Sequence, residues 1–527
     1  MTFDHNVLAY GDNLDYLRGM PSESVDLIYL DPPFNSKRDY NAQFGADAQV
    51  KAFEDTFTWG SDDEAALRAF AKSHKDLGQF LMALGNVLPK QGLYPYLVSM
   101  SIRLFEMHRI LKDTGSLYLH VDPTASHYLK MVLDKIFGLD MFRSEISWER
   151  SNPKGKVTRW ASCHDVILFY SKSKKYTFNP QFRALSEAGL KPYNKEDARG
   201  RYRVGPLDDP NGNPNLMYAY QAANGLTYQP PAKGWRVTEE NMRKLEAEGR
   251  LAYPSQASGR LSKKLYLADS KGAAIADVWT DIGPLQSKDP ERTGYGTQKP
   301  LALLERIVLA SSNEGDVVLD PFMGSGTTCV AAAKLGRKFI GFDLTPIAVA
   351  TAKARLDEAG VDLTDLDEWG SPQDLQSARH LYEGDKRSFD CWAVMRCSAM
   401  PADIGDRVIG LRGYMRFDSK GLHHCKALYA VSLDEPPSIN DVDRIKRLMK
   451  VKGAEMGLLI CFDLPNAEVL EAVAAAGEVK LNGDAKKAPK IGVITVQDVI
   501  DQNYLATEVF SHERVQRQTL DAQLELV

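Results

Sequence analysis

Hydrophobic runs alternating with amphipathic stretches indicate an α/β layer in the first 175 residues. The run at 25–30 predicts a buried strand that ends at Asp31, and 100–111 predicts an amphipathic helix closed by a basic turn and a glycine. The next strand is expected at 116–121. Strand, helix and strand joined by short connections are typical of a doubly wound α/β domain. Residues about 40–90 interrupt this pattern, and we interpret them as an insertion.

The alternation is lost between residues 176 and 290 and then returns. The intervening region is rich in Gly, Pro, Tyr and Asn, which predicts a loop-rich insert. Pro300 suits the first turn of the helix that follows. The elements expected after it are a helix over 301–312, a strand over 316–320, a helix over 327–335 and a strand over 338–342. Residues 359–388 are polar and acidic and predict a linker, and fresh strand and helix patterns begin at residue 389.

Bulk composition narrows the class of protein. A chain of 527 residues is long enough for three domains. Its six cysteines are scattered without a CxxC motif, which favours reduced thiols in the cytoplasm over disulfides or a zinc site. The N-terminus has neither the basic flank nor the apolar core of a signal peptide, and no stretch is apolar enough to cross a bilayer. A cytoplasmic protein without membrane attachment is therefore expected.

Charge distribution is more informative than the net charge of −5. Between Arg150 and Arg203 there are 13 Lys and Arg residues against 4 Asp and Glu residues. An ordinary solvated surface would explain this excess. A local basic face on an acidic protein is also how an enzyme acting on nucleic acid can bind phosphates, and Lys154, Lys156 and Arg159 are the candidates for that contact.

A glycine-rich turn follows the predicted strand at 316–320. The string Asp320-Pro321-Phe322-Met323-Gly324-Ser325-Gly326-Thr327-Thr328 joins a strand to a helix, as nucleotide-type cofactor loops do. It lacks the Gly-Lys-[Ser/Thr] of a Walker loop and is not a regular GxGxxG. Asp343 ends the next strand, nineteen residues after Gly324, where a carboxylate can accept hydrogen bonds from ribose hydroxyls. The turn alone is a weak signal, and the spacing of Asp343 strengthens it.

The string Asp31-Pro32-Pro33-Phe34 follows the predicted strand at 25–30. A carboxylate and a carbonyl held rigid by two prolines can both accept hydrogen bonds from one NH2 group. The exocyclic amine of adenine or cytosine is a poor nucleophile because its lone pair is delocalised into the ring. Two acceptors favour a more tetrahedral nitrogen, whose lone pair can attack a methyl sulfonium. The simpler interpretation is a proline-rich turn in which Asp31 caps a helix.

The two strings together resemble those of the amino-methylating DNA methyltransferases, in the circularly permuted arrangement called the beta class. In that class the catalytic half precedes the cofactor half, and target recognition lies between them. Further segments that fit the resemblance are Tyr10-Gly11-Asp12-Asn13, residues 104–121, Trp148, residues 164–170 and Thr297-Gln298-Lys299-Pro300. The resemblance covers about residues 5–175 and 290–355. It implies a Rossmann-like core that uses S-adenosylmethionine.

The resemblance also implies roles for individual residues. Asp31 and the carbonyl of Pro32 would accept from the target amine, with Pro33 completing the rigid turn and Phe34 stacking on the base. The base would have to leave the double-stranded DNA to reach them. Asp343 would bind the cofactor ribose, and Lys299 would face its methionine part. The full cofactor set is Asp12, Lys299, Asp320, Phe322, Gly324, Gly326 and Asp343. The transfer needs no metal.

Adenine N6 is the expected target, since Asp at the first position is typical of N6-adenine enzymes and Ser of N4-cytosine enzymes. A C5-cytosine enzyme needs a nucleophilic Pro-Cys, and none of the six cysteines follows a proline. Three alternatives stay open: an N4-cytosine methyltransferase, a DNA-binding protein that has lost turnover, and a fused restriction–modification enzyme. The resemblance is compatible with a homodimer and with a cognate restriction endonuclease as partners.

The C-terminal segment resembles the Mrr-type restriction-endonuclease-like domains. Active members hold a metal with an Asp and a strand carrying Glu/Gln-x-Lys. The matching positions here are Gly410, Ala430 and Ser432, so we expect an α/β nuclease-like domain that does not cut DNA. The expected organisation is a catalytic half at 1–175, a target-recognition region at 176–290, a cofactor half at 291–358, a linker at 359–388 and this domain at 389–527.

Overall fold

The computed structural model describes residues 5–33, 39–44, 48–54, 59–88, 92–151, 158, 160–254, 259–286, 288–295, 297–418, 421–482 and 486–501. The chain divides into two compact units, of which the first comprises Met1–Asn179 and Asp277–Val527 and the second Pro180–Ala276. Within the described ranges no helix is long and apolar enough to cross a membrane.

A nine-stranded mixed sheet forms the centre of the first unit, in the order β16-β6-β7-β5-β2-β17-β18-β1-β19. The strands from β5 to β19 are all parallel, whereas β7 runs antiparallel to both β5 and β6. The bounds are β1 Asn6–Tyr10, β2 Val25–Leu30, β5 Leu111–Val121, β6 Phe142–Glu149, β7 His164–Ser171, β16 Val278–Trp279, β17 Val317–Asp320, β18 Lys338–Asp343 and β19 Leu366–Trp369. Every residue of β2 is buried, as expected for a parallel strand covered on both faces.

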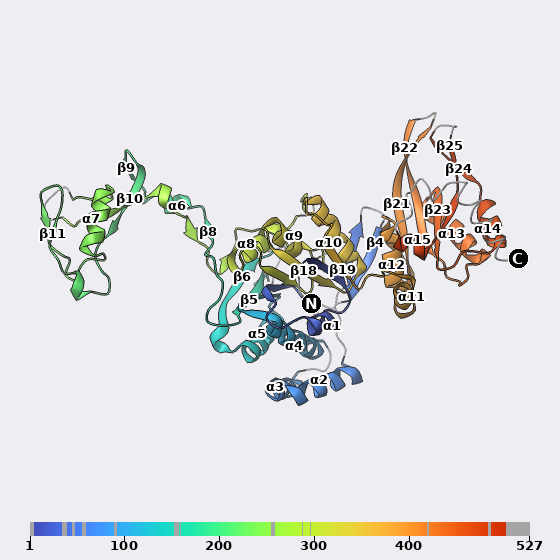
Figure 1. The fold of residues 1–527 in the computed structure, drawn as a ribbon, viewed down its shortest axis with the longest axis horizontal. Helices are drawn as coiled ribbons and strands as arrows, with labels where there is room; N and C mark the ends of the chain where they lie inside the picture. The colour runs from blue at the N-terminus through green and yellow to red at the C-terminus, as the bar shows by residue number, and fades with distance from the viewer. Residues whose placement is uncertain are drawn as a thin grey trace. The chain divides into compact units, whose positions relative to one another are not determined.

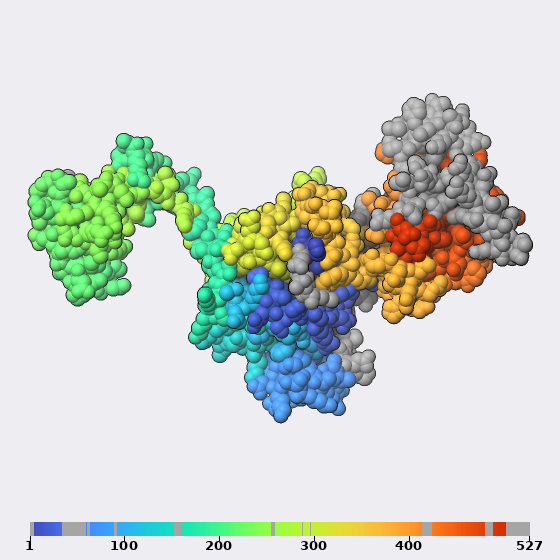
Figure 2. All heavy atoms as spheres, in the orientation of Figure 1, coloured from blue at the N-terminus to red at the C-terminus, as the bar shows by residue number. Residues whose placement is uncertain are grey.

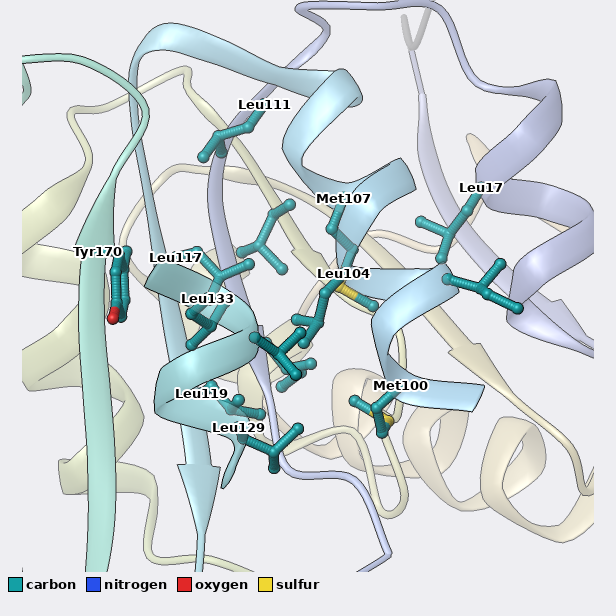
Figure 3. Close-up of a cluster of buried hydrophobic side chains, with 14 of the residues drawn as sticks. Leu17, Met100, Leu104, Met107, Leu111, Leu117, Leu119, Leu129, Leu133 and Tyr170 are labelled. Carbon is teal, nitrogen blue, oxygen red and sulfur yellow. The ribbon is translucent and has the colours of Figure 1, made fainter. Parts of the chain in front are cut away.

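Helices cover the two faces of this sheet (Figure 1). One layer contains α1, α4 and α5, and the other contains α8, α9 and α10. Their bounds are α1 Asn13–Gly19, α4 Leu93–Ile110, α5 Ser126–Phe137, α8 Leu301–Ser311, α9 Thr327–Lys334 and α10 Pro346–Glu358. Figure 3 shows how Leu104 and Met107 of α4 meet Leu117 and Leu119 of β5 in the core under the first layer. This packing confirms the doubly wound α/β layer predicted from the hydrophobic pattern.

The two halves of the core meet where β2 pairs with β17. Leu27 lies opposite Val318 and Ile28 opposite Leu319, in parallel register. Parallel strands end at the same edge of a sheet, so the two predicted motifs, 289 positions apart in the sequence, follow neighbouring strand ends. The site is therefore assembled from both halves of the chain.

The predicted insertion and the predicted linker both contain regular elements. The insertion at about 40–90 contains β3 Asp39–Phe44, β4 Ala48–Glu54, α2 Ser61–Ser73 and α3 Lys75–Gly85. The predicted linker at 359–388 was wrong, because it contains β19, which pairs with β1, and the helix α11 Leu375–Gly384. The polar composition of this segment gave no sign that Trp369 packs against the core. The centroid of its ring lies 6.1 Å from that of Tyr16. A short edge strand of this kind has no clear hydrophobic alternation of its own.

The second unit lies inside the predicted target-recognition region. Its elements are short: α6 Glu187–Leu190, α7 Glu239–Ala247, β8 Phe182–Arg183, β9 Lys195–Asp197, β10 Gly200–Pro206, β11 Tyr220–Gln221, β12 Thr227–Tyr228, β13 Leu251–Ala252, β14 Ser262–Tyr266 and β15 Ala273–Ala274. A small core around Tyr220, Trp235 and Met242 holds it together. The insert is therefore a folded body, although loops make up much of it as predicted.

The C-terminal segment has a second sheet, in the order β25-β24-β21-β22-β23-β26, with β20 on β21. Its elements are α12 Lys386–Arg396, β20 Met400–Ile404, β21 Arg407–Asp418, β22 Gly421–Val431, α13 Ile439–Lys452, β23 Met456–Cys461, α14 Ala467–Ala474, β24 Glu478–Asn482, β25 Lys486–Pro489, β26 Ile491–Thr495 and α15 Val496–Ile500. Gly410 and Ala430 lie on the neighbouring strands β21 and β22, and the Ser432 hydroxyl donates to Asp441 at 2.7 Å. The nuclease-like interpretation of this segment remains a prediction.

The fold predicts that Gly326→Ala destabilises the protein. Gly326 has φ +75°, and an added Cβ would lie 2.4 Å from the Cβ of Ala352 on α10. Strain at positive φ and overpacking together should cost about 2 kcal/mol or more, and lower the melting temperature by several degrees. Gly384→Ala is the control, because nothing lies within 4 Å of its Cβ position. Equal melting temperatures for the two variants would contradict the expected clash.

Candidate active site

A cavity of about 250 Å³ lies at the carboxyl ends of β2, β17 and β18. Asp31 follows β2, Asp320 ends β17 and Asp343 ends β18, and all three line the cavity. Pro32 and Pro33 line it as well. The edge where parallel strands end is the usual ligand site of open α/β sheets. The structure thus brings the proline turn and the glycine turn to one place, as the sequence predicted.

Asp31 forms an ion pair with Lys299, which precedes α8. The two side chains are only 14% and 12% exposed, so water screens this pair weakly. Lys299 was expected to face the methionine part of the cofactor. It does line the cavity, but its ammonium group contacts the predicted catalytic carboxylate. The pair therefore ties the catalytic half to the cofactor half and fixes the position of Asp31.

The glycine turn needs backbone conformations that other residues rarely adopt. Gly324 has φ +50° and Gly326 has φ +75°, both in the left-handed region. Gly324 lines the cavity, and its N–H donates to Asp343 Oδ2 at 3.0 Å. Gly326 does not line the cavity and instead caps the N-terminus of α9. The ring of Tyr295 lies 3.2 Å from the Cβ position of Gly324, so the turn has room only for glycine there.

Asp320 is a buried carboxyl group and Asp343 a partly buried one, and the protein donates hydrogen bonds to both. The Thr328 hydroxyl and the Phe322 N–H donate to Asp320, and the Thr345 N–H donates to Asp343 at 3.0 Å. Burial raises the pKa of Asp320 to about 7 and the pKa of Asp343 to about 6. Each therefore takes up a proton near neutral pH more readily than an exposed carboxyl group. Phe322 also lines the cavity.

Asp12 does not line the cavity, unlike its neighbours Gly11 and Asn13. Its carboxylate accepts from Leu14 N–H at the start of α1 and pairs with Arg103 at 2.8 Å. Asn13 donates from Nδ2 to the carbonyl of Pro321 at 2.7 Å, which joins the N-terminal segment to the glycine turn. The amide of Asn13, and not the carboxylate of Asp12, therefore contacts the glycine turn.

A buried hydrogen-bonded network borders the cavity beside Asp31. Tyr29 lines the cavity, and its hydroxyl lies 2.8 Å from His120 Nδ1. His120 Nε2 lies 3.1 Å from Asp165 Oδ2, and Arg150 Nε lies 3.1 Å from Asp165 Oδ1. Burial acts to raise the pKa of Asp165, but the His120 hydrogen bond and nearby cations lower it overall, so Asp165 is anionic. The ring of Trp148 packs edge-on against His120.

The sequence contains a signal for part of this network. Tyr29 lies two positions before Asp31. Because alternate residues of a strand point to the same face, the two side chains are expected on the same side of the sheet. His120 lies at the end of the neighbouring strand β5. Its partner Asp165 is 45 positions away, and only the antiparallel pairing of β5 with β7 brings the two together.

Arg355 is another residue that the sequence did not reveal. It lies on α10 with 9% exposure, and its Nη1 donates to the Ser325 carbonyl at 2.9 Å and to Thr327 Oγ1 at 2.8 Å. Both acceptors belong to the glycine turn. Arg355 therefore fixes the shape of the turn from behind, without lining the cavity itself.

Four predicted site residues lie outside the described residues: Phe34, Lys154, Lys156 and Arg159. The predicted stacking and phosphate contacts of these residues stay predictions. Among the residues that the structure does describe, no cluster of three or more His, Cys, Asp or Glu side chains could hold a metal ion.

The family model for N6/N4 DNA methylases matches residues 25–354. The chain belongs to this DNA methylase family. It is an S-adenosylmethionine-dependent DNA methyltransferase whose target is the N6 of adenine or the N4 of cytosine. The matched range ends inside α10 and leaves the C-terminal segment outside it.

Two relatives agree with this assignment. The chain is 32% identical to the type II methyltransferase M.EcaI of Enterobacter cloacae over 358 residues, which are 66% of this chain and 69% of that protein. It is 27% identical to the DNA adenine methyltransferase YhdJ of Escherichia coli over 354 residues, or 67% and 83%. Among solved structures, a DNA modification methylase of Thermus thermophilus with S-adenosyl-L-methionine is 18% identical over 69% of this chain and 98% of that one, with a TM-score of 0.33.

The charges of the residues that line the cavity complement the net charge of S-adenosylmethionine. Three carboxyl groups line the cavity against one lysine, and that lysine is already paired with Asp31. S-adenosylmethionine carries a sulfonium and an ammonium group against one carboxylate, so its net charge is positive. A cavity with surplus carboxyl groups favours such a ligand, and loss of the methyl group removes the sulfonium charge. When bound, the cofactor supplies an electrophilic methyl group.

These charges predict that cofactor affinity rises with pH. A cation in the cavity favours the ionised forms of Asp320 and Asp343, so binding lowers their pKa values from about 7 and about 6. Affinity should be highest above about pH 8 and fall as the pH drops through these values. Calorimetry between about pH 5.5 and pH 8.5 measures this slope.

The neutral product S-adenosylhomocysteine should show a shallower slope than the cofactor, and Asp320→Asn should flatten the slope for the cofactor. The amide of the variant still accepts from Thr328, which makes it a close match in shape. Equal slopes for cofactor and product would contradict the charge argument.

Proposed function

We propose that the protein transfers a methyl group from S-adenosylmethionine to the N6 of adenine within a specific sequence of double-stranded DNA. The observation that supports this most directly is the single cavity lined by Asp31, Pro32 and the glycine turn at Gly324. An amine bound at the first two residues would lie in the same cavity as a donor bound at the third. Methyl transfer needs this proximity.

The residues of the cavity account for the chemistry of transfer. Asp31 and the Pro32 carbonyl accept one hydrogen bond each from the two N–H groups of the amine, which localises the nitrogen lone pair. The nitrogen would then form a bond to the methyl carbon as the carbon–sulfur bond broke, which would leave a neutral thioether, and the proton lost from the nitrogen would pass to solvent. Lys299 keeps Asp31 in place before the base arrives. The base must be flipped out of the double helix, because N6 is paired inside it.

The choice of adenine over cytosine rests on Asp31. Asp at this position resembles the N6-adenine enzymes, whereas N4-cytosine enzymes usually carry Ser. The relative YhdJ is named an adenine methyltransferase, which supports the same choice. N4-cytosine methylation is the alternative within the family.

We assign sequence recognition to the second unit together with the basic stretch from Arg150. The unit Pro180–Ala276 holds 15 Lys and Arg residues against 10 Asp and Glu residues, in a chain whose net charge is −5. A positive body on an acidic enzyme favours contact with DNA phosphates. Arg150 is the first residue after β6, and it pairs with the buried Asp165.

The first test identifies the base and the recognition sequence. The protein is expressed in a host without DNA methylation, and its DNA is sequenced with detection of modified bases. We expect N6-methyladenine at one recurring sequence, absent with Asp31→Ala and present with the exposed control Asp113→Ala. Removing the acceptor should slow transfer by about a hundredfold or more while leaving cofactor affinity within about tenfold. Methylation of cytosine would instead establish the alternative.

The second test addresses recognition. Replacing Pro180–Ala276 with the corresponding unit of a relative that methylates another sequence should transfer that relative's specificity to this enzyme. The same sequencing assay reads the outcome, and cofactor affinity of the chimera serves as the check on folding. An unchanged recognition sequence in a chimera that binds the cofactor would place recognition elsewhere in the chain.

A further inference from the structure

The C-terminal segment packs against the cofactor half instead of forming a detached domain. One cluster of buried hydrophobic side chains contains Tyr295, Ile347 and Ala348 of the cofactor half together with Phe389 and Trp392 of α12. Helices α10 and α12 are in direct contact. Figure 2 shows the corresponding surface, on which atoms of the cofactor half (yellow) adjoin those of the first C-terminal helices (orange).

One face of α12 makes this contact. Ser388 and Cys391 both lie near the hydroxyl of Tyr10 at the end of β1. Met395 and Arg355 of α10 both line a second cavity, separate from the one that contains Asp31. Positions 388, 391, 392 and 395 follow the i, i+3, i+4, i+7 spacing of a single helical face, so Trp392 belongs to it as well.

Another face of α12 packs on its own sheet. Val394 lies 2.8 Å from the Cβ position of Gly410 on β21, which places it against the C-terminal strands. The helix therefore joins two layers, with one face for each. Substitutions on the two faces have different expected effects on the cofactor site.

Three of the contacts of α12 lead directly to the cofactor cavity. Tyr295 is 4% exposed and belongs to the shared hydrophobic cluster, yet it also lines the cavity and lies against Gly324. Thr345, whose N–H donates to Asp343 at 3.0 Å, lies near the hydroxyl of Tyr295. Tyr295 therefore lies between the glycine turn and the rest of the hydrophobic cluster.

The second and third contacts act through β1 and α10. Tyr10 pairs with Asp343 in the sheet, and the Gly11 N–H donates to the Asp343 carbonyl at 2.9 Å. Helix α10 carries Arg355, which holds the glycine turn through Ser325. Each segment that shapes the cofactor cavity on this side is therefore packed from behind by α12.

We propose that the C-terminal segment completes the cofactor site, with Trp392 as a positioning residue that holds Tyr295 and α10 against the glycine turn. The segment would then have a role in methyl transfer whether or not it resembles a nuclease. A separable domain would leave cofactor binding intact when its contact with the core is weakened. A segment that completes the site lowers cofactor affinity in the same experiment.

The test compares two full-length variants that each lose a buried hydrophobic side chain, at Trp392 or at Leu470. Trp392→Ala opens the contact with the cofactor half. Leu470→Ala on α14 weakens the other hydrophobic cluster of the same segment, which includes no residue of the cofactor half. Calorimetry without DNA gives the dissociation constant for S-adenosylmethionine, and thermal melting shows that each variant is folded.

We expect Trp392→Ala to raise the dissociation constant about tenfold, with Leu470→Ala within about threefold of the parent at a comparable drop in melting temperature. Trp392→Phe should restore most of the affinity, and kcat at saturating cofactor should change little. Parental affinity in Trp392→Ala, or equal losses in both alanine variants, would overturn the proposal. Because binding is measured without DNA, the result is independent of which base is methylated.

Discussion

The parallel pairing of β2 with β17 is the contact on which the rest of the site depends. It joins strands that are almost three hundred residues apart and sets Asp31 beside Asp320 at one edge of the sheet. In the proposed function neither strand end forms the site alone, since one would carry the acceptors for an amine and the other the turn for the methyl donor. The site therefore requires that the two strands are neighbours in the sheet, whichever half comes first in the chain.

The sequence was sufficient for the elements whose physical signals are local. Apolar runs ending in Asp31 and Asp320 predicted strands, and the glycines predicted a turn, which the structure shows at φ +50° and +75°. Contacts that depend on pairing across the sheet had no local signal. Asp165 reaches His120 only through the register of β5 and β7, and Lys299 reaches Asp31 across the seam between the halves. Polar composition also concealed β19, whose place is set by its neighbour β1.

The ion pair between Asp31 and Lys299 is one part of the charge balance in the cavity. Two further carboxyl groups, Asp320 and Asp343, lie in the same small space, and burial raises the pKa of each. Lys299 offsets part of the negative charge of the cavity. A bound cationic cofactor would offset more of it.

The match to the methylase family ends at residue 354, but the hydrophobic packing of the cofactor half does not. Tyr295, Ile347 and Ala348 are buried in one hydrophobic cluster with Phe389 and Trp392 of α12. Helix α12 thus shares a buried cluster with the cofactor half and also packs on its own sheet. Gly410 and Ala430 are small apolar residues on neighbouring strands of that sheet, where packing favours them. If the C-terminal segment completes the cofactor site, as proposed, the folded unit that binds the cofactor is longer than the stretch that the family model matches.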